Sequence, residues 1–205
     1  MIVIVDYGMG NLRSIQNKFE RLGAEILISS RTEDLESADR IVLPGVGAFD
    51  VGMANLAESG LLRTLQEEVM DRRKPLLGIC LGMQLLTDSS EEGKLAGLGW
   101  VPGDTRLIRF DPGQTKLRVP HMGWNTLNVK RSNNLLTGVA GDASFYFVHS
   151  YYVDCANAED VVATTHYGRD MASVVQHGNV YGTQFHPEKS HEAGVQILKN
   201  FLECN

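Results

Sequence analysis

The 205-residue sequence has only three cysteines, and they form neither a CxxC motif nor a cluster with histidine. Structural zinc sites need four closely spaced cysteine or histidine ligands, which this spacing does not provide. His149, His166, His177 and His191 show no metal-ligand spacing either. We therefore expect no metal site, and an odd, sparse set of cysteines indicates a reducing compartment, the cytoplasm.

The sequence also lacks a surplus of positive charge and a long apolar run. Its formal net charge is −6, which argues against a nucleic-acid-binding surface as the main function. The longest nearly apolar stretch, residues 76–86, is too short to span a bilayer and contains Gln84. Met1 leads directly into apolar residues without a basic region or a cleavage site, so we expect no secretory signal and no membrane association.

No internal repeat, linker or low-complexity tract interrupts the chain. We therefore expect one domain over residues 1–205. A hydrophobic content of 43% with 21% charged residues is ordinary for a globular protein with a sizeable core.

Short apolar runs alternate with helical patterns in the first half of the chain. The pattern predicts strands over residues 2–5, 25–28, 40–43 and 76–79, and helices near 12–22, near 61–72 and from Leu81 onward. Such alternation is typical of βαβ units with a mostly parallel sheet. The second half is β-rich, with expected strands over 107–110, 125–129, 145–149, 151–153, 161–165, 172–176 and 180–184 and a closing helix over 191–202. We predict an α/β fold in which helices flank a mostly parallel central sheet and extra strands join its edge.

The stretch LLGICLGMQ, residues 76–84, runs an apolar strand into a glycine-flanked cysteine. Gly78 and Gly82 leave room for a tight strand-to-helix turn with Cys80 at its apex. At a helix N-terminus the unpaired N–H groups favour a thiolate, and the N–H of Leu81 can stabilise an oxyanion. This pattern indicates a nucleophile, whereas the other two cysteines are interpreted as small buried apolar residues.

A second motif, VYGTQFHPE at residues 180–188, ends in His186 and Glu188 separated by Pro187. Proline stiffens the segment and holds His186 toward an extended conformation. Glu188 can then orient His186, which can take the thiol proton and later return it to a leaving amine. A lone histidine at a strand end could be structural, but together with Cys80 the pair predicts a catalytic triad for acyl transfer.

A third motif lies where the strand at 40–43 enters a loop with glycines on both sides of Val46. Two glycines let the backbone approach a ligand closely, so Val46 and Gly47 could supply a second oxyanion N–H, although an ordinary βα turn is the alternative. Gly8–Met9–Gly10 invites a dinucleotide-binding interpretation, but Arg13 stands where the third glycine would be.

These three motifs together resemble the class I, triad-type glutamine amidotransferases, whose fold is flavodoxin-like. The resemblance implies that the chain hydrolyses glutamine to glutamate and ammonia through a γ-glutamyl thioester on Cys80. It implies no cofactor, and it implies a partner synthase that uses the ammonia.

Four further segments, residues 6–11, 120–125, 147–152 and 189–190, look like those of the glutaminase subunits of imidazole glycerol phosphate synthases. That likeness implies histidine biosynthesis and a heterodimer with a (β/α)8-barrel cyclase subunit, which forms imidazole glycerol phosphate and an aminoimidazole carboxamide ribotide. By the same likeness, glutamine would be held by Gln84, Glu92, Ser150 and Tyr151, and the cyclase would be faced by Asn11, Trp124 and Lys189. Glu91 could replace Glu92 by a one-residue shift.

Two alternatives stay open. The chain could be the glutaminase of another synthase, of the pyridoxal phosphate or anthranilate type, although segments 120–125 and 147–152 count against this. It could also be a noncatalytic binding subunit of the same fold, although Cys80, His186 and Glu188 are intact. Without the resemblance, Trp124 would be interpreted as a core aromatic, and Lys189 could equally be a solvated lysine.

Overall fold

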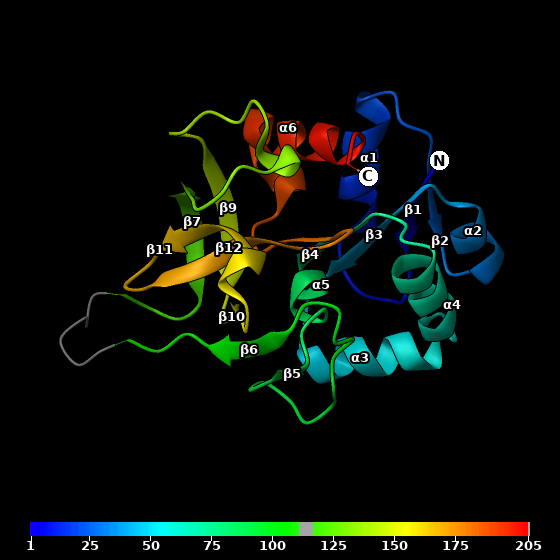
Figure 1. Ribbon diagram of the computed structural model, residues 1–205, viewed down its shortest axis with the longest axis horizontal. Helices are drawn as coiled ribbons and strands as arrows, with labels where there is room; N and C mark the ends of the chain where they lie inside the picture. Colours follow the sequence, from blue (N-terminus) through cyan, green and yellow to red (C-terminus); the bar gives the residue numbers. More distant parts are fainter. Residues whose placement is uncertain (111–116, 205) are drawn as a thin grey trace.

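The computed structural model describes residues 1–110 and 117–204 (Figure 1). Within them the centre is an eight-stranded sheet with strand order β2-β1-β3-β4-β13-β12-β11-β8. In chain order these strands are β1 (Ile2–Val5), β2 (Ile26–Ser29), β3 (Arg40–Gly45), β4 (Leu76–Cys80), β8 (Asn128–Val129), β11 (Val161–His166), β12 (Asp170–His177) and β13 (Val180–Thr183). The strands from β2 to β13 pair in parallel, and β12, β11 and β8 continue the sheet with antiparallel pairing.

Helices cover both faces of this sheet. They are α1 (Leu12–Arg21), α2 (Thr32–Ser37), α3 (Phe49–Glu58), α4 (Leu62–Gln66), α5 (Leu81–Gln84) and α6 (His191–Phe201), and a π-helical turn, η1 (Glu67–Asp71), continues α4. Short 3-10 turns are η2 (Asn134–Leu136), η3 (Ala158–Asp160) and η4 (Pro187–Lys189). Figure 1 shows α1 and α6 on one side of the sheet and α3 and α4 on the other.

The hydrophobic core is divided into two layers by the sheet. Ile4 of β1 packs with Phe19 of α1 and Phe201 of α6. Val5, the next residue of β1, packs in the other layer, which contains Phe49 of α3. Because successive side chains of a strand point to opposite faces, a strand buried on both faces reads as a continuous apolar run. This explains why the parallel strands could be recognised in the sequence.

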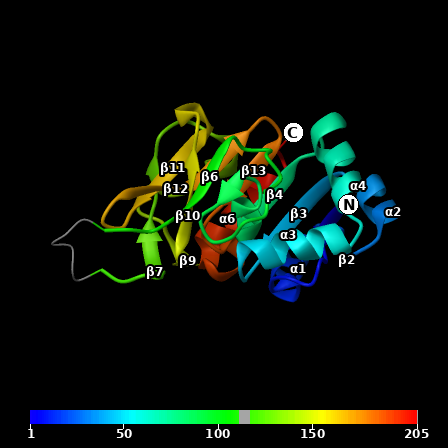
Figure 2. The same cartoon turned by 90° about the horizontal axis from the view of Figure 1, so that it is seen from below.

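The extra strands of the second half do not all join the edge of the central sheet, as we had expected. That expectation is correct for β12, β11 and β8. It is wrong for β6 (Gly103–Leu107) and β10 (Tyr151–Cys155), which form a separate sheet with β5 (Ser89–Ser90), and for β7 (His121–Thr126) and β9 (Ser144–His149), which pair antiparallel with each other. Figures 1 and 2 place β7 and β9 at the end of the molecule away from β2 and α2. Apolar periodicity indicates a strand but does not specify its partner.

Some predicted element boundaries also differ from the structure. The helix from Leu81 is a single turn of four residues. The strand expected at 107–110 lies at 103–107, where it pairs with β10, and Ile108 and Phe110 beyond its end pack with Tyr152. The stretch 125–129 is shared between β7 and β8, which belong to different sheets. Helices α2 and α3 were not predicted.

Among the described residues, no helix combines the length and the apolar character needed to cross a membrane. The extent of a single domain over residues 1–205 stays a prediction.

Candidate active site

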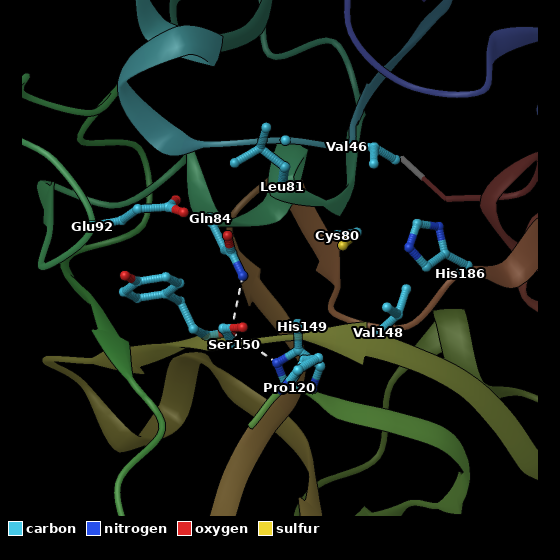
Figure 3. A pocket seen from close by; sticks show the side chains of 12 residues that line it. Val46, Cys80, Leu81, Gln84, Glu92, Pro120, Val148, His149, Ser150 and His186 are labelled. Carbon is cyan, nitrogen blue, oxygen red and sulfur yellow. Dashed lines mark hydrogen bonds between the residues drawn. The ribbon is translucent and has the colours of Figure 1, made fainter. Parts of the chain in front are cut away.

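A cavity of about 260 Å³ opens where β3, β4 and β13 end (Figure 3). It is lined by Val46, Gly47, Cys80, Leu81, Gln84, Glu92, Pro120, Val148, His149, Ser150, Tyr151 and His186. Every residue that the sequence suggested for the oxyanion hole and for glutamine binding is in this set, together with Cys80 and His186. The carboxyl ends of parallel strands are where ligands bind in open α/β sheets.

Cys80 sits at a strained point between β4 and α5. Its φ is 56° and its ψ is −109°, a backbone conformation that non-glycine residues rarely adopt. The neighbouring glycines are required by close packing: a Cβ on Gly82 would lie 1.9 Å from the carbonyl oxygen of Leu43, and one on Gly78 would lie 2.8 Å from the carbonyl oxygen of Gly82. Because α5 has only one turn, the helix-dipole contribution expected at the thiol is small.

His186 is held by Glu188 in a buried pair. The imidazole Nδ1 lies 2.9 Å from Oε1 of Glu188, and both side chains are at most 3% exposed. Since the carboxylate accepts this hydrogen bond, Nδ1 carries a proton. The other ring nitrogen, Nε2, is buried and makes no regular hydrogen bond within the described part of the chain. Figure 3 shows the imidazole facing the sulfur of Cys80.

The pKa of His186 is raised by its neighbours. Burial alone would lower the pKa, but the interactions with Cys80 and Glu188 favour the charged imidazolium more strongly and raise it to about 9. The raised pKa means that Nε2 of His186 readily takes up and keeps a proton released by Cys80.

The candidate oxyanion loop, residues 45–47, joins β3 to α3. Gly47 has a φ of +136°, and a Cβ on it would lie 2.6 Å from the terminal methyl carbon of Met9. The Tyr7 hydroxyl donates a hydrogen bond to the carbonyl oxygen of Pro44 at the base of the loop. The loop after β1 thus packs directly against residues 45–47. The oxyanion role of Val46, Gly47 and Leu81 stays a prediction.

Gln84 and Glu92 lie at the end of the cavity away from His186 (Figure 3). Gln84 Nε2 donates to the carbonyl oxygen of Tyr151 at 2.9 Å and to Oε1 of Gln184 at 3.1 Å. Glu92 Oε2 accepts from the backbone N–H of Phe49 at 2.8 Å, at the start of α3.

Glu91 and Glu92 differ in what their side chains contact. Glu91 accepts hydrogen bonds from the Leu107 N–H and from Arg109, whereas Glu92 lines the cavity. Beside this wall, burial and then the charges of Glu92 and Glu91 raise the pKa of Tyr151. The geometry therefore favours Glu92 as the residue that faces a ligand.

Of the residues expected to face a partner, Trp124 and Lys189 lie together. The Trp124 ring is 48% exposed and stacks on His191 at 4.8 Å with an interplanar angle of 3°. Tyr146 meets the edge of Trp124, and Lys189 Nζ lies 5.9 Å from the centre of the Tyr146 ring. We call Trp124, Tyr146, Lys189 and His191 the aromatic cluster. The interpretation of Trp124 as a core residue is wrong.

Asn11 occupies a different place. It is the exposed N-cap of α1, and its Oδ1 accepts from the backbone N–H of Ser14 at 3.3 Å. This cap accounts for the residue structurally, so a partner contact of Asn11 stays a prediction.

Sequence reasoning missed Gln184 and the pair His121 and His149. Gln184 is fully buried, and its Nε2 lies 3.8 Å from Cys80 Sγ. A signal was present, because Gln184 stands two residues before His186, and residues two apart in an extended segment point the same way.

The comparisons with known proteins agree with this geometry. Residues 3–204 match the family model described as glutamine amidotransferase class-I. The chain is 52% identical over 204 residues to a protein of Methanothermobacter thermautotrophicus named imidazole glycerol phosphate synthase subunit HisH, covering 99% of this chain and 98% of that protein. A protein of Bdellovibrio bacteriovorus with the same name is 47% identical over 203 residues, which cover 99% of this chain and 100% of that protein.

Solved structures share the fold at lower identity. A structure described as a glutamine amidotransferase superposes with a TM-score of 0.75 at 22% identity, covering 99% of this chain and 98% of that one. The chain therefore belongs to the class I glutamine amidotransferase family. Within that family it groups with the HisH subunits of imidazole glycerol phosphate synthase. The fold class and the family predicted from the sequence are confirmed.

Proposed function

We propose that this chain is the glutaminase subunit of an imidazole glycerol phosphate synthase in histidine biosynthesis, and that it hydrolyses glutamine to glutamate and ammonia. The observation that carries the proposal is the juxtaposition of Cys80, at a strained turn, with buried His186 and its partner Glu188 in one cavity. Identity over the full chain to the HisH subunits supports the assignment to this synthase.

In this proposal Cys80 is the nucleophile. Its sulfur attacks the carboxamide carbon of glutamine and its proton passes to Nε2 of His186. The negative charge that develops on the carboxamide oxygen is stabilised by backbone N–H groups of Leu81 and of the Val46–Gly47 segment. His186 then protonates the departing nitrogen, ammonia leaves, and a γ-glutamyl thioester remains on Cys80.

Hydrolysis of the thioester uses the same histidine. His186 takes a proton from a water molecule, which attacks the thioester carbon and releases glutamate, and the proton returns to the sulfur. Glu188 keeps the Nδ1 proton in place throughout and stabilises the imidazolium. A pKa of about 9 suits His186 to protonating the leaving nitrogen.

The far end of the cavity would hold the amino-acid end of glutamine. Glu92 uses one carboxylate oxygen for the Phe49 N–H, which leaves the other for the α-ammonium group of the substrate. Gln84, Ser150 and Tyr151 line the same region. The reacting carboxamide would then lie beside Cys80 (Figure 3).

The partner in this proposal is a cyclase subunit with a (β/α)8 barrel, which receives the ammonia and forms a heterodimer with this chain. The aromatic cluster provides the exposed Trp124 ring and the Lys189 cation for docking. Met122, which lies on strand β7 with Trp124, is 62% exposed. Asn11 would add a further contact. Exposed aromatic rings are frequent interface anchors. The cytoplasmic location rests on the three free cysteines.

The test is glutamate release from glutamine by the purified chain, alone and with the cyclase subunit and its nucleotide ligand. We expect strong stimulation by the complex, complete loss in Cys80→Ala and retention in the matched control Cys155→Ala, because Cys155 lies outside the cavity. Rapid glutamate release that does not depend on the cyclase subunit would indicate another amidotransferase. No turnover under any condition would indicate a noncatalytic subunit.

A further inference from the structure

Two buried histidines, of which His149 lines the cavity and His121 lies behind it, take no part in the proposed reaction steps. His121 and His149 are 2% and 6% exposed, and they face each other across β7 and β9. Nδ1 of His121 lies 3.0 Å from Nε2 of His149. At the inner end Nδ1 of His149 lies 2.8 Å from the carbonyl oxygen of Tyr151, and at the outer end Nε2 of His121 lies 3.3 Å from Nδ2 of Asn125.

The direction of each hydrogen bond in this row of side chains can be deduced from its inner end, at the Tyr151 carbonyl. The Tyr151 carbonyl can only accept, so His149 carries its proton on Nδ1 and has a lone pair on Nε2. His121 must then donate from Nδ1, and its Nε2 accepts from the Asn125 amide. Burial lowers the pKa of His149 to about 3 and that of His121 to about 4, which keeps both rings neutral, as this arrangement requires.

The position of the His121 ring is fixed by packing. It stacks against Phe147 at 4.9 Å and against Tyr167 at 4.1 Å. The chain of hydrogen bonds therefore starts from a ring that has little freedom to turn.

The Tyr151 carbonyl oxygen also accepts a second hydrogen bond, from a side chain that lines the cavity. Gln84 Nε2 donates one hydrogen to it and the other to Oε1 of Gln184. With both hydrogens engaged, the remaining polar atom of the Gln84 amide is its oxygen, which can only accept. The same contacts orient Gln184, whose Nε2 faces Cys80 Sγ at 3.8 Å.

We propose that His149, which accepts a hydrogen bond from His121, is a positioning residue of the glutaminase site. It fixes the peptide plane of Tyr151 and thereby the orientation of two amide side chains. Gln84 then presents its oxygen to an N–H group of bound glutamine, and Gln184 presents an N–H group to the Cys80 sulfur, where it stabilises the negative charge of the thiolate. The role in glutamine binding rests on the proposed function, whereas the protonation pattern of the two rings does not.

The first test removes the donor of His149 in one variant and retains a donor in another. His149→Phe fills the same space without a donor, and His149→Asn retains an N–H close to the position of Nδ1. We measure kcat and KM for glutamine in the complex with the cyclase subunit and its nucleotide ligand. Loss of one buried hydrogen bond corresponds to about a tenfold change. We therefore expect KM to rise about tenfold or more in His149→Phe and to return to within about threefold of the wild-type value in His149→Asn.

Equal KM values for His149→Phe and the wild type would overturn the proposal, as would equal impairment of the Phe and Asn variants. If His149→Phe does not fold, His121→Phe tests the next link, since its ring can keep the stack with Phe147 and Tyr167. A raised KM is expected there, and an unchanged one overturns the proposal. An inactive wild-type complex would instead refute the proposed function.

A second readout does not depend on activity. Long-range ¹H–¹⁵N spectra of the histidine rings distinguish the two neutral tautomers and the charged form. We expect both His121 and His149 to be neutral with the proton on Nδ1. A proton on Nε2 of either ring, or a charged ring at neutral pH, overturns the assigned direction.

Discussion

Replacing Gly82 by alanine should destabilise the protein strongly, although alanine is the better helix former. An added Cβ would lie 1.9 Å from the carbonyl oxygen and 2.8 Å from the carbonyl carbon of Leu43. Both atoms belong to the backbone of β3, so no side chain can move aside to relieve the contact. Gly82 does not have a positive φ, which means that the backbone conformation itself would accept alanine and the cost is entirely steric.

The expected magnitude follows from the displacement required. A Cβ and a carbonyl oxygen need a separation of more than 3.0 Å, so α5 and β3 must move apart by more than 1 Å. Overpacking typically costs about 1–3 kcal/mol. Because β3 lies in the middle of the sheet and cannot yield easily, we expect a loss of about 3 kcal/mol or more. The same displacement would move Cys80, and a shift of about 1 Å can cost about 100-fold in rate.

The assay is urea unfolding at equilibrium, with glutamate release measured on the folded variant. Gly141→Ala is the matched control, because an added Cβ there has no neighbour within 4 Å among the described residues and Gly141 has no positive φ. Its free energy of unfolding should stay within about 0.5 kcal/mol of the wild-type value. A loss below about 1 kcal/mol in Gly82→Ala, with normal glutaminase activity, would refute the argument from close packing.

Three further predictions concern charge and exposure. The folded-state pKa of His186 is about 9, above its ordinary 6.5, because Cys80 and Glu188 favour the charged ring. The stability that this shift contributes is full below pH 6.5 and is lost as the pH rises through 9. The urea midpoint should therefore fall over this range less in His186→Gln than in the wild type, and equal slopes would contradict this. Glu92→Gln should raise the KM for glutamine about tenfold, because a charge-assisted hydrogen bond is lost. The control variant Glu91→Gln should keep the steady-state KM within about twofold of the wild-type value. A larger effect of Glu91→Gln would assign the ligand role to Glu91. Trp124→Ala should weaken the affinity for the cyclase, measured by calorimetry, about tenfold or more. The control variant Val129→Ala, which removes an exposed apolar side chain of β8, should bind the cyclase as tightly as the wild type. Equal affinities of Trp124→Ala and the wild type would place the interface elsewhere.

The chemistry-bearing residues could be predicted from the sequence because their geometry is local. A glycine two residues on each side of Cys80 and a single proline between His186 and Glu188 determine what those segments can do before any long-range contact forms. The parallel strands could be predicted for a similar reason, since burial on both faces leaves a continuous apolar run.

The missed features depend on contacts between distant parts of the chain. The pairing of β7 with β9 joins residues 18 to 28 positions apart, and a short amphipathic strand can satisfy several partners equally well. The directions of Glu91 and Glu92 follow from Arg109 and Phe49, which no local pattern links to them. The role inferred for His149 depends on where a carbonyl oxygen and two amides meet in space.

The two tryptophans of the chain differ sharply in environment. Trp100 is 2% exposed and donates its indole N–H to Gln66, whereas Trp124 is 48% exposed and lies on His191 within the aromatic cluster. Intrinsic fluorescence of the unlabelled protein therefore combines a constant signal from the interior with one that responds to solvent at the proposed docking face. Subtracting the spectrum of Trp124→Phe isolates the second signal, so the chain carries its own optical probe for the arrival of a partner.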